Sequence, residues 1–159
     1  MNIPFWISDW LKNKFSEFRV TDNKFPKNIF IDRSDSEADK QKTRQIMNEN
    51  EVINFLKKKN FKVLTLSKYN FSEQIKFFYN AEKIVGLHGA GFGNLPFCRP
   101  NIKIVEFKNN NKVKAIENLA KKNNLVYNSI MCEPFKYKLN NQQGHIKIPL
   151  LELEKKIDE

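Results

Sequence analysis

The stretch KIVGLHGAGFGNLPFCRPNIKIVEF, residues 83–107, holds two short apolar runs separated by a segment rich in glycine. The runs KIVGL at 83–87 and KIVEF at 103–107 consist almost entirely of apolar residues, most of them β-branched. Such runs are typical of strands that are buried on both faces, which occur in parallel sheets covered by helices. The stretch therefore predicts two neighbouring strands of a parallel sheet, joined by a glycine-rich connection.

Apolar strands alternate with amphipathic helices on both sides of this stretch. Further strands are expected in NIFIDR, FKVLTL and LVYNSI, at 28–33, 61–66 and 125–130. This alternation predicts an α/β fold with a Rossmann-like, mostly parallel sheet and helices on both faces. Ligands of such sheets bind beyond the carboxyl ends of the strands, at the point where the strand order reverses.

The connecting helices are expected at 43–59, after Asn70, and over 113–120. Asn70 and Glu73 match the pattern of a capping box at the start of the second helix. The first helix is predicted from an apolar stripe with the spacing of an α-helix, made of Ile46, Ile53 and Leu56 and widened by Met47, Val52 and Phe55.

The length of 159 residues favours one domain that spans 1–159, because a chain of this size buries roughly 68–70% of its surface on folding. A core at 28–130 is flanked by an amphipathic helix within 1–20 and by a terminal helix at 149–157. In the first of these helices, apolar residues recur at helical spacing, namely Ile7, Trp10, Leu11, Phe15 and Phe18. We expect this stripe to cover the domain's own core; the alternative is docking onto a second domain or a membrane surface.

The formal net charge of +10 raises nucleic acid as a partner, because clustered cations displace counterions from phosphates. However, 24 of the cations are lysines and only 4 are arginines, alongside 21 asparagines, which is the composition that an AT-rich coding sequence produces. We therefore expect no nucleic-acid partner. No apolar run approaches the ~18 residues of a membrane span, and no secretion signal is recognised at the start. The expected location is the cytoplasm, either free or at the inner face of the membrane.

Only two cysteines occur, Cys98 and Cys132, and they lie 34 positions apart. There is no CxxC pair, and the two histidines are isolated, so no metal site is expected. We expect both cysteines to be buried free thiols; a disulfide between them is the alternative.

Four of the five glycines lie in GLHGAGFGN at 86–94. Small residues directly after a strand let backbone amides approach an anion at the start of a helix. Close packing of helix on strand needs glycine equally often, so the glycines alone leave both roles open. Glu106, in the next strand, stands where an acidic side chain binds the ribose of a nucleotide. The sequence lacks GK[ST], which excludes a Walker A loop, and the glycines come too late in the chain for a typical dinucleotide site.

The arginines are more informative than the lysines because the composition favours lysine. Arg33 closes the first strand at the edge where the ligand is expected, and its planar fork suits bidentate binding of a diphosphate. Arg44 either binds the same anion or pairs with Glu49. Arg99, beyond the glycines, is expected at the surface.

Together, IDRSD, TRQIMNENEVINFL and FSEQIKFFYNAEKIVGLHGAGFGNLPFCRPNIKIVEF resemble glycosyltransferase family 61 in order and spacing. The resemblance covers roughly residues 28–130, and the HGAG segment with Asn94 and Glu106 is its most specific part. It implies an inverting, nucleotide-sugar-dependent transferase of the two-domain GT-B type, as in bacterial capsular polysaccharide and lipopolysaccharide synthesis. The chain resembles the carboxyl-terminal, donor-binding half of such an enzyme.

The resemblance also assigns roles to residues. It implies that Arg33 and the amides of Gly89, Ala90 and Gly91 contact the diphosphate of the donor. His88, as the catalytic residue, and Asn94 are implied to flank the donor sugar or its leaving phosphate, and Glu106 to hold the ribose. Asn48 and Glu49 fall in the matching NE segment, either as donor contacts or as residues that order the helix. The alternative for His88 is a neutral hydrogen-bonding role in a packed turn. Beyond the nucleotide-sugar donor, no cofactor or metal is implied.

A GT-B site lies between two domains, and the domain that would hold the saccharide acceptor has no counterpart in these residues. The general base that takes the proton of the acceptor is expected in that missing domain as well. The chain is therefore expected to be a fragment, one product of a split gene, or a subunit that needs a separate amino-terminal half or a second copy of the chain. The alternative of a different class is a noncatalytic, anion- or nucleic-acid-binding basic module. A chain that folds without a function is the third possibility.

Overall fold

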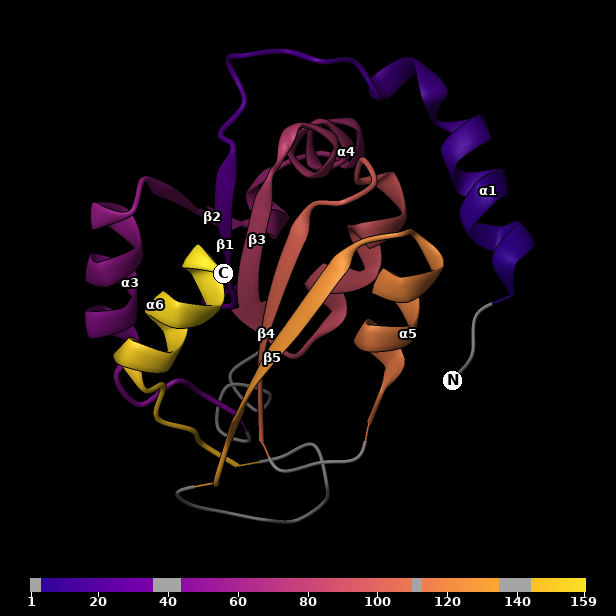
Figure 1. Cartoon of the computed structure of the whole chain (residues 1–159). Helices are drawn as coiled ribbons and strands as arrows, with labels where there is room; N and C mark the ends of the chain where they lie inside the picture. Colours follow the sequence, from indigo (N-terminus) through magenta and orange to yellow (C-terminus); the bar gives the residue numbers. More distant parts are fainter. Residues whose placement is uncertain (1–3, 36–43, 110–112, 135–143) are drawn as a thin grey trace.

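The computed structural model describes residues 4–35, 44–109, 113–134 and 144–159. Its centre is a sheet of five parallel strands in the order β2-β1-β3-β4-β5 (Figure 1). In chain order the strands are β1 (Asn28–Asp32), β2 (Phe61–Thr65), β3 (Lys83–Leu87), β4 (Lys103–Asn109) and β5 (Val126–Cys132). The parallel α/β fold predicted from the alternating pattern is therefore confirmed.

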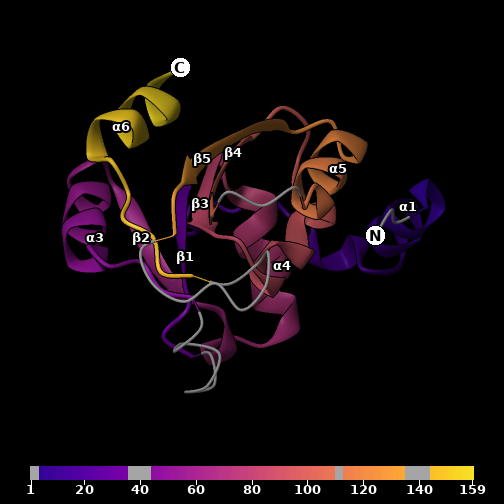
Figure 2. The same ribbon diagram turned by 90° about the horizontal axis from the view of Figure 1, so that it is seen from below.

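Helices cover both faces of the sheet, as the view in Figure 2 shows. On one face, α4 (Phe71–Asn80) and α5 (Ala115–Lys122) pack with the 3-10 helix η3 (Ala90–Phe97). On the other face lie α3 (Glu49–Lys58) and α6 (Leu150–Asp158). Successive strand residues point to opposite faces, so Ile29 and Ile31 join the first core cluster while Phe30 joins the second.

The structure confirms the capping box at the start of α4. The Asn70 side chain accepts a hydrogen bond from the Glu73 amide at 3.0 Å, and the Glu73 carboxylate accepts one from the Asn70 amide at 2.9 Å. The short 3-10 helix η2 (Leu66–Lys68) precedes this cap. The free, buried state of Cys98 and Cys132 is also confirmed.

The expected helix over 43–59 is too long, because the helix begins only at Glu49. Residues before it pair with the C-terminal segment instead: the Met47 amide donates to the Ile146 carbonyl at 2.8 Å, and the Ile146 amide donates to the Gln45 carbonyl at 2.9 Å. Ile46 is therefore buried through a parallel bridge to Ile146 and not through a helical stripe. Met47, expected on that stripe, is 51% exposed.

The N-terminal helix α1 (Phe5–Lys14) is followed by the 3-10 helix η1 (Ser16–Phe18). Its Leu11, together with Phe15 and Phe18, packs on the core cluster of the α4 face, as expected. Trp10 was expected on the same stripe, but it is 54% exposed. The apolar stripe is thus narrower than the sequence pattern predicts.

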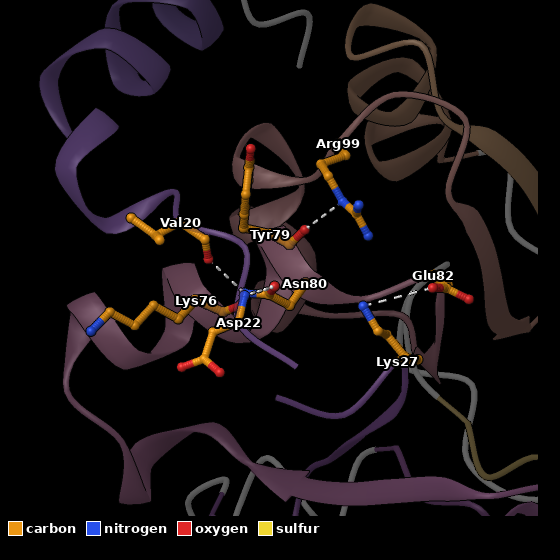
Figure 3. A network of polar contacts seen from close by, with 8 residues as sticks. All are labelled: Val20, Asp22, Lys27, Lys76, Tyr79, Asn80, Glu82 and Arg99. Carbon is orange, nitrogen blue, oxygen red and sulfur yellow. Dashed lines mark hydrogen bonds and ion pairs between the residues drawn. The ribbon is translucent and has the colours of Figure 1, made fainter. Parts of the chain in front are cut away.

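Asn80, at the end of α4, fixes the segment that leads from η1 to β1 (Figure 3). Its fully buried side chain donates to the carbonyls of Val20 at 3.0 Å and Lys76 at 2.9 Å, and accepts from the Asp22 amide at 2.8 Å. Nearby, half-buried Arg99 donates to the Tyr79 carbonyl at 3.0 Å. No described helix is long and apolar enough to cross a membrane.

Candidate functional site

The carboxyl ends of β1 and β3 lie side by side in the sheet. The chain passes from β1 to β2 on one side, whereas β3, β4 and β5 extend on the other, so the strand order reverses between β1 and β3. In open parallel sheets, such a reversal leaves a crevice beyond the strand ends in which ligands bind. Arg33 directly follows β1 and His88 directly follows β3, so both lie at this crevice.

A cavity of about 270 Å³ opens at this edge of the sheet. Its polar lining includes Arg33 and Ser34 after β1, together with Arg44 and Glu49 at the approach to α3. Leu87, at the end of β3, contributes to its apolar part. The volume is close to the lower limit of roughly 300 Å³ for small-molecule pockets, which suits the charged portion of a larger ligand.

The Arg33 side chain lies against the turn that follows β3. Its Nη1 donates a hydrogen bond to the main-chain carbonyl of His88 at 3.3 Å. A Cβ atom added to Gly89 would lie 3.5 Å from Arg33 Nε, so the guanidinium occupies the side of Gly89 toward which a side chain would project. Burial lowers the pKa of Arg33, and the nearby charge of Asp35 acts in the opposite direction. The group remains a cation with a planar fork of donors.

Arg44 adds a second half-buried cation to the cavity. Burial and the charge of Arg33 together lower its pKa to about 10, against the charge of Glu106, which acts in the opposite direction. The two guanidinium groups therefore repel each other across a partly desolvated space. An anion bound between them would reduce this repulsion, which favours a negatively charged ligand.

The acidic groups at the same edge differ in protonation behaviour. Burial raises the pKa of Glu49, and the charge of Asp32 raises it as well. Burial also acts to raise the pKa of Asp32, but hydrogen bonds from Ser34 and Thr65 outweigh it and lower that pKa. The Thr65 hydroxyl donates to Asp32 at 2.7 Å and the Ser34 amide at 3.1 Å. Sequence reasoning missed Asp32 and Thr65, although Asp-x-Ser after a strand is a turn signal.

The glycine segment combines close packing with backbone amides that come before the first hydrogen bond of η3. A Cβ atom on Gly91 would lie 2.8 Å from Ile31 Cγ2, whereas one on Gly93 would meet nothing within 4 Å. Gly91 therefore permits the close approach of η3 to β1, the packing role that the sequence left open. The first hydrogen bond of η3 runs from the Phe92 amide to the Gly89 carbonyl at 3.2 Å. The amides of Ala90 and Gly91 come before it in the chain, so they do not take part in the hydrogen bonds of the helix. Their contact with a diphosphate stays a prediction.

On the α4 face of the sheet, three polar side chains form a continuous cluster. Glu106 is fully buried in β4, and its two carboxylate oxygens contact His88 Nδ1 and the Tyr127 hydroxyl. His88 itself is only 7% exposed. Burial raises the pKa of Tyr127, as do its hydrogen bond to Glu106 and the charge of that residue. Binding of ribose by Glu106 stays a prediction, but both its oxygens already have partners within the protein.

Asn48 and Asn94 make structural contacts away from the cavity lining. The Asn48 amide donates to the Ile148 carbonyl at 3.0 Å, and its oxygen accepts from the Ile148 amide at 2.9 Å. Asn48 thus ties the start of α3 to the C-terminal segment. The Asn94 amide donates to Gln74 of α4 at 2.9 Å. A donor contact of either asparagine stays a prediction.

Sequence-predicted residues therefore fall into two neighbouring groups. Arg33, Arg44 and Glu49 line the cavity, whereas His88 and Glu106 form the buried cluster with Tyr127. The hydrogen bond from Arg33 to the His88 carbonyl connects the two groups. Sequence reasoning missed Tyr127; the only available signal was a polar aromatic residue in the apolar run LVYNSI.

Comparison with known protein families gives a match to the model described as glycosyltransferase 61, over residues 2–105. The matched region includes α1, which lies outside the range over which the resemblance was expected, and it ends one residue before Glu106. No curated protein matches the chain at a significant level. Because the family model covers well over half of the residues, the chain belongs to the glycosyltransferase 61 family.

Proposed function

We propose that this chain binds the nucleotide-sugar donor of a glycosyl transfer at the cavity between the ends of β1 and β3. The observation that carries the proposal is the pair of half-buried arginines, Arg33 and Arg44, which line one cavity at the point where the strand order reverses. The diphosphate of a donor supplies the negative charge that this pair of cations favours. Charge-assisted hydrogen bonds to such a group contribute roughly 1.5–3 kcal/mol each.

The same groups have a chemical role in the proposed reaction. When the bond between the anomeric carbon and the diphosphate breaks, negative charge accumulates on the departing diphosphate. Cations and amides that already point at this position stabilise the transition state without reorganisation. Arg33, Arg44 and the amides of Ala90 and Gly91 are the groups we assign to this task, and the proposed reaction proceeds without a resident metal.

The family resemblance extends the proposal to inverting transfer by a two-domain GT-B enzyme, with this chain as the donor-binding half. The saccharide acceptor would be held by a separate amino-terminal half or by a second copy of the chain. The resemblance to capsular polysaccharide enzymes favours a bacterial surface polysaccharide as the product and the cytoplasm, or the inner face of the membrane, as the location.

Calorimetric titration with UDP-, GDP- and CMP-sugars tests this function. We expect saturable binding of a nucleoside-diphosphate sugar that Arg33→Met and Arg44→Met each weaken at least tenfold, equivalent to about 1.4 kcal/mol. Lys62→Met is the matched control, because it removes one exposed cation from β2, outside the cavity lining. Absence of binding, or equal weakening by the control, contradicts the proposal. Binding that collapses with salt and ignores all three substitutions would identify the noncatalytic basic module instead.

A further inference from the structure

Glu106 is an ionisable group on the sheet face that carries the core cluster beneath α4 and α5. The residue is fully buried, and Ile104 of the same strand lies on the same face among core residues. Burying a carboxylate is costly unless hydrogen bonds compensate for the lost water. Apolar residues would fill this position at a lower cost, so stability alone gives no reason for an acid here.

The register of the sheet explains how both oxygens of Glu106 find a partner. Glu106 pairs directly with Gly86 on β3 and with Ser129 on β5. His88 lies two residues beyond Gly86, and Tyr127 lies two residues before Ser129, so both are diagonal neighbours of the carboxylate on adjacent strands. His88 therefore contacts one oxygen and Tyr127 the other.

The donor and acceptor chemistry of this cluster fixes the position of the protons. An ionised carboxylate only accepts hydrogen bonds, so His88 Nδ1 and the Tyr127 hydroxyl must both donate. We propose that Glu106 is a positioning residue that keeps the proton of the His88 ring on Nδ1 and leaves Nε2 as a hydrogen-bond acceptor, while Tyr127 binds the other oxygen of the same carboxylate.

With Nε2 as an acceptor, His88 is suited to take a proton from the saccharide acceptor and not to donate one to the leaving phosphate. The acceptor hydroxyl oxygen forms its bond to the anomeric carbon while the bond from that carbon to the diphosphate breaks, and the electron pair leaves with the diphosphate. The hydroxyl proton moves to His88 Nε2 and then to water. The tautomer is a property of the protein without ligand, whereas this use of Nε2 rests on the proposed function.

Nitrogen NMR of the histidine rings in the complete chain tests the tautomer directly. The sequence has only two histidines, so His145→Gln assigns the signals of His88. We expect the proton on Nδ1 in the unsubstituted protein. In Glu106→Gln, the Tyr127 hydroxyl donates to the amide oxygen, so the amide group faces His88 and the ring proton moves to Nε2. Adding Tyr127→Phe frees the amide to turn, and part of the Nδ1 form returns.

A proton on Nε2 in the unsubstituted protein overturns the proposal, and so does a tautomer that Glu106→Gln leaves unchanged. The first of these results needs no change at Glu106 or Tyr127, so the proposal remains falsifiable if those substituted chains fail to fold. Tyr127→Phe alone should leave the proton on Nδ1, because the carboxylate still accepts from His88. If the ring proton of His88 moves to Nε2 in Tyr127→Phe, the claim that the Glu106 carboxylate alone holds it on Nδ1 is contradicted.

Donor kinetics separate this role from a ribose contact. With a donor that the chain turns over, Glu106→Gln should lower kcat by roughly 100-fold, the lower end of the contribution of a positioned acid or base, with the donor KM changed less than about twofold. A ribose contact predicts the opposite, a raised KM with kcat preserved, and that result overturns the proposed role. If the unsubstituted chain binds no donor at all, the proposed function fails, while the tautomer measurement still decides the positioning role.

Discussion

Replacing Gly91 by alanine should destabilise the fold, because the new methyl group meets the core. The added Cβ atom would lie 2.8 Å from Ile31 Cγ2 and 3.2 Å from Leu66 Cδ1. Both neighbours are buried, and Ile31 is β-branched and belongs to a central strand, so neither can move away cheaply. Overpacking of this kind costs about 1–3 kcal/mol.

Gly93→Ala is the matched control for this substitution. Gly93 belongs to the same 3-10 helix and is exposed, and its added Cβ atom would meet nothing within 4 Å. Both substitutions restrict the unfolded chain equally, which by itself stabilises by roughly 0.4–1 kcal/mol. The difference between the two variants therefore isolates the clash.

Urea and thermal unfolding of the ligand-free protein measure this difference. We expect Gly91→Ala to be less stable than Gly93→Ala by about 1–3 kcal/mol, or roughly 2–12 °C in Tm for a chain of this size. Unfolding free energies that agree within about 0.5 kcal/mol would refute the packing role. The lack of a side chain at Gly91 would then matter only for a ligand that approaches the backbone, and such a role does not affect the stability of the ligand-free protein.

Three further substitutions or reagents test other parts of the structure. The pKa of Glu49 is raised in the folded protein, so the free energy of unfolding should fall as the pH rises from 4.5, the ordinary pKa of a glutamate, toward the raised pKa. In urea titrations, Glu49→Gln should abolish this pH-dependent loss of stability. If the pH dependence is the same in the variant, the burial of the Glu49 charge is contradicted. Asn48→Ala leaves the amide and carbonyl of Ile148 without their side-chain partner, so it should cost roughly 1–3 kcal/mol and speed hydrogen exchange at that amide. Burial raises the pKa of Cys98, and it raises that of Cys132 to about 11, so neither thiol should react with a disulfide reagent at pH 8 before unfolding; rapid labelling of either would show that the core opens.

Local patterns predicted most of the fold because strand and helix periodicity reflect which side chains face the core. The runs KIVGL and KIVEF are neighbouring parallel strands, and Asn70 caps a helix with Glu73, as their sequences indicate. The first connecting helix was predicted too long because the position of Ile46 depends on a bridge to Ile146, which lies 100 positions later. Periodicity within a short window contains no information about such a partner.

The candidate site could be predicted only in part for the same reason. Arg33 lies at the ligand edge because it follows a strand, and strand ends are visible in the sequence. The direction of the Glu106 side chain depends on the register between β3, β4 and β5, which no local pattern specifies. That register turns the carboxylate toward His88 and Tyr127. Tyr127 could not be identified before the pairing of β4 with β5 was known.

The sequence contains only four arginines, which makes their side-chain NMR signals a direct test of nucleotide binding at this edge. Titration of the ligand-free protein with UDP and with GDP should shift the Nε signals of Arg33 and Arg44 saturably with at least one nucleotide. The signals of Arg19 and Arg99, which lie by Tyr79 on the α4 side, should stay in place. If Arg33 and Arg44 do not respond to either nucleotide, or if all four signals move together, the assignment of the donor diphosphate to this cavity is contradicted.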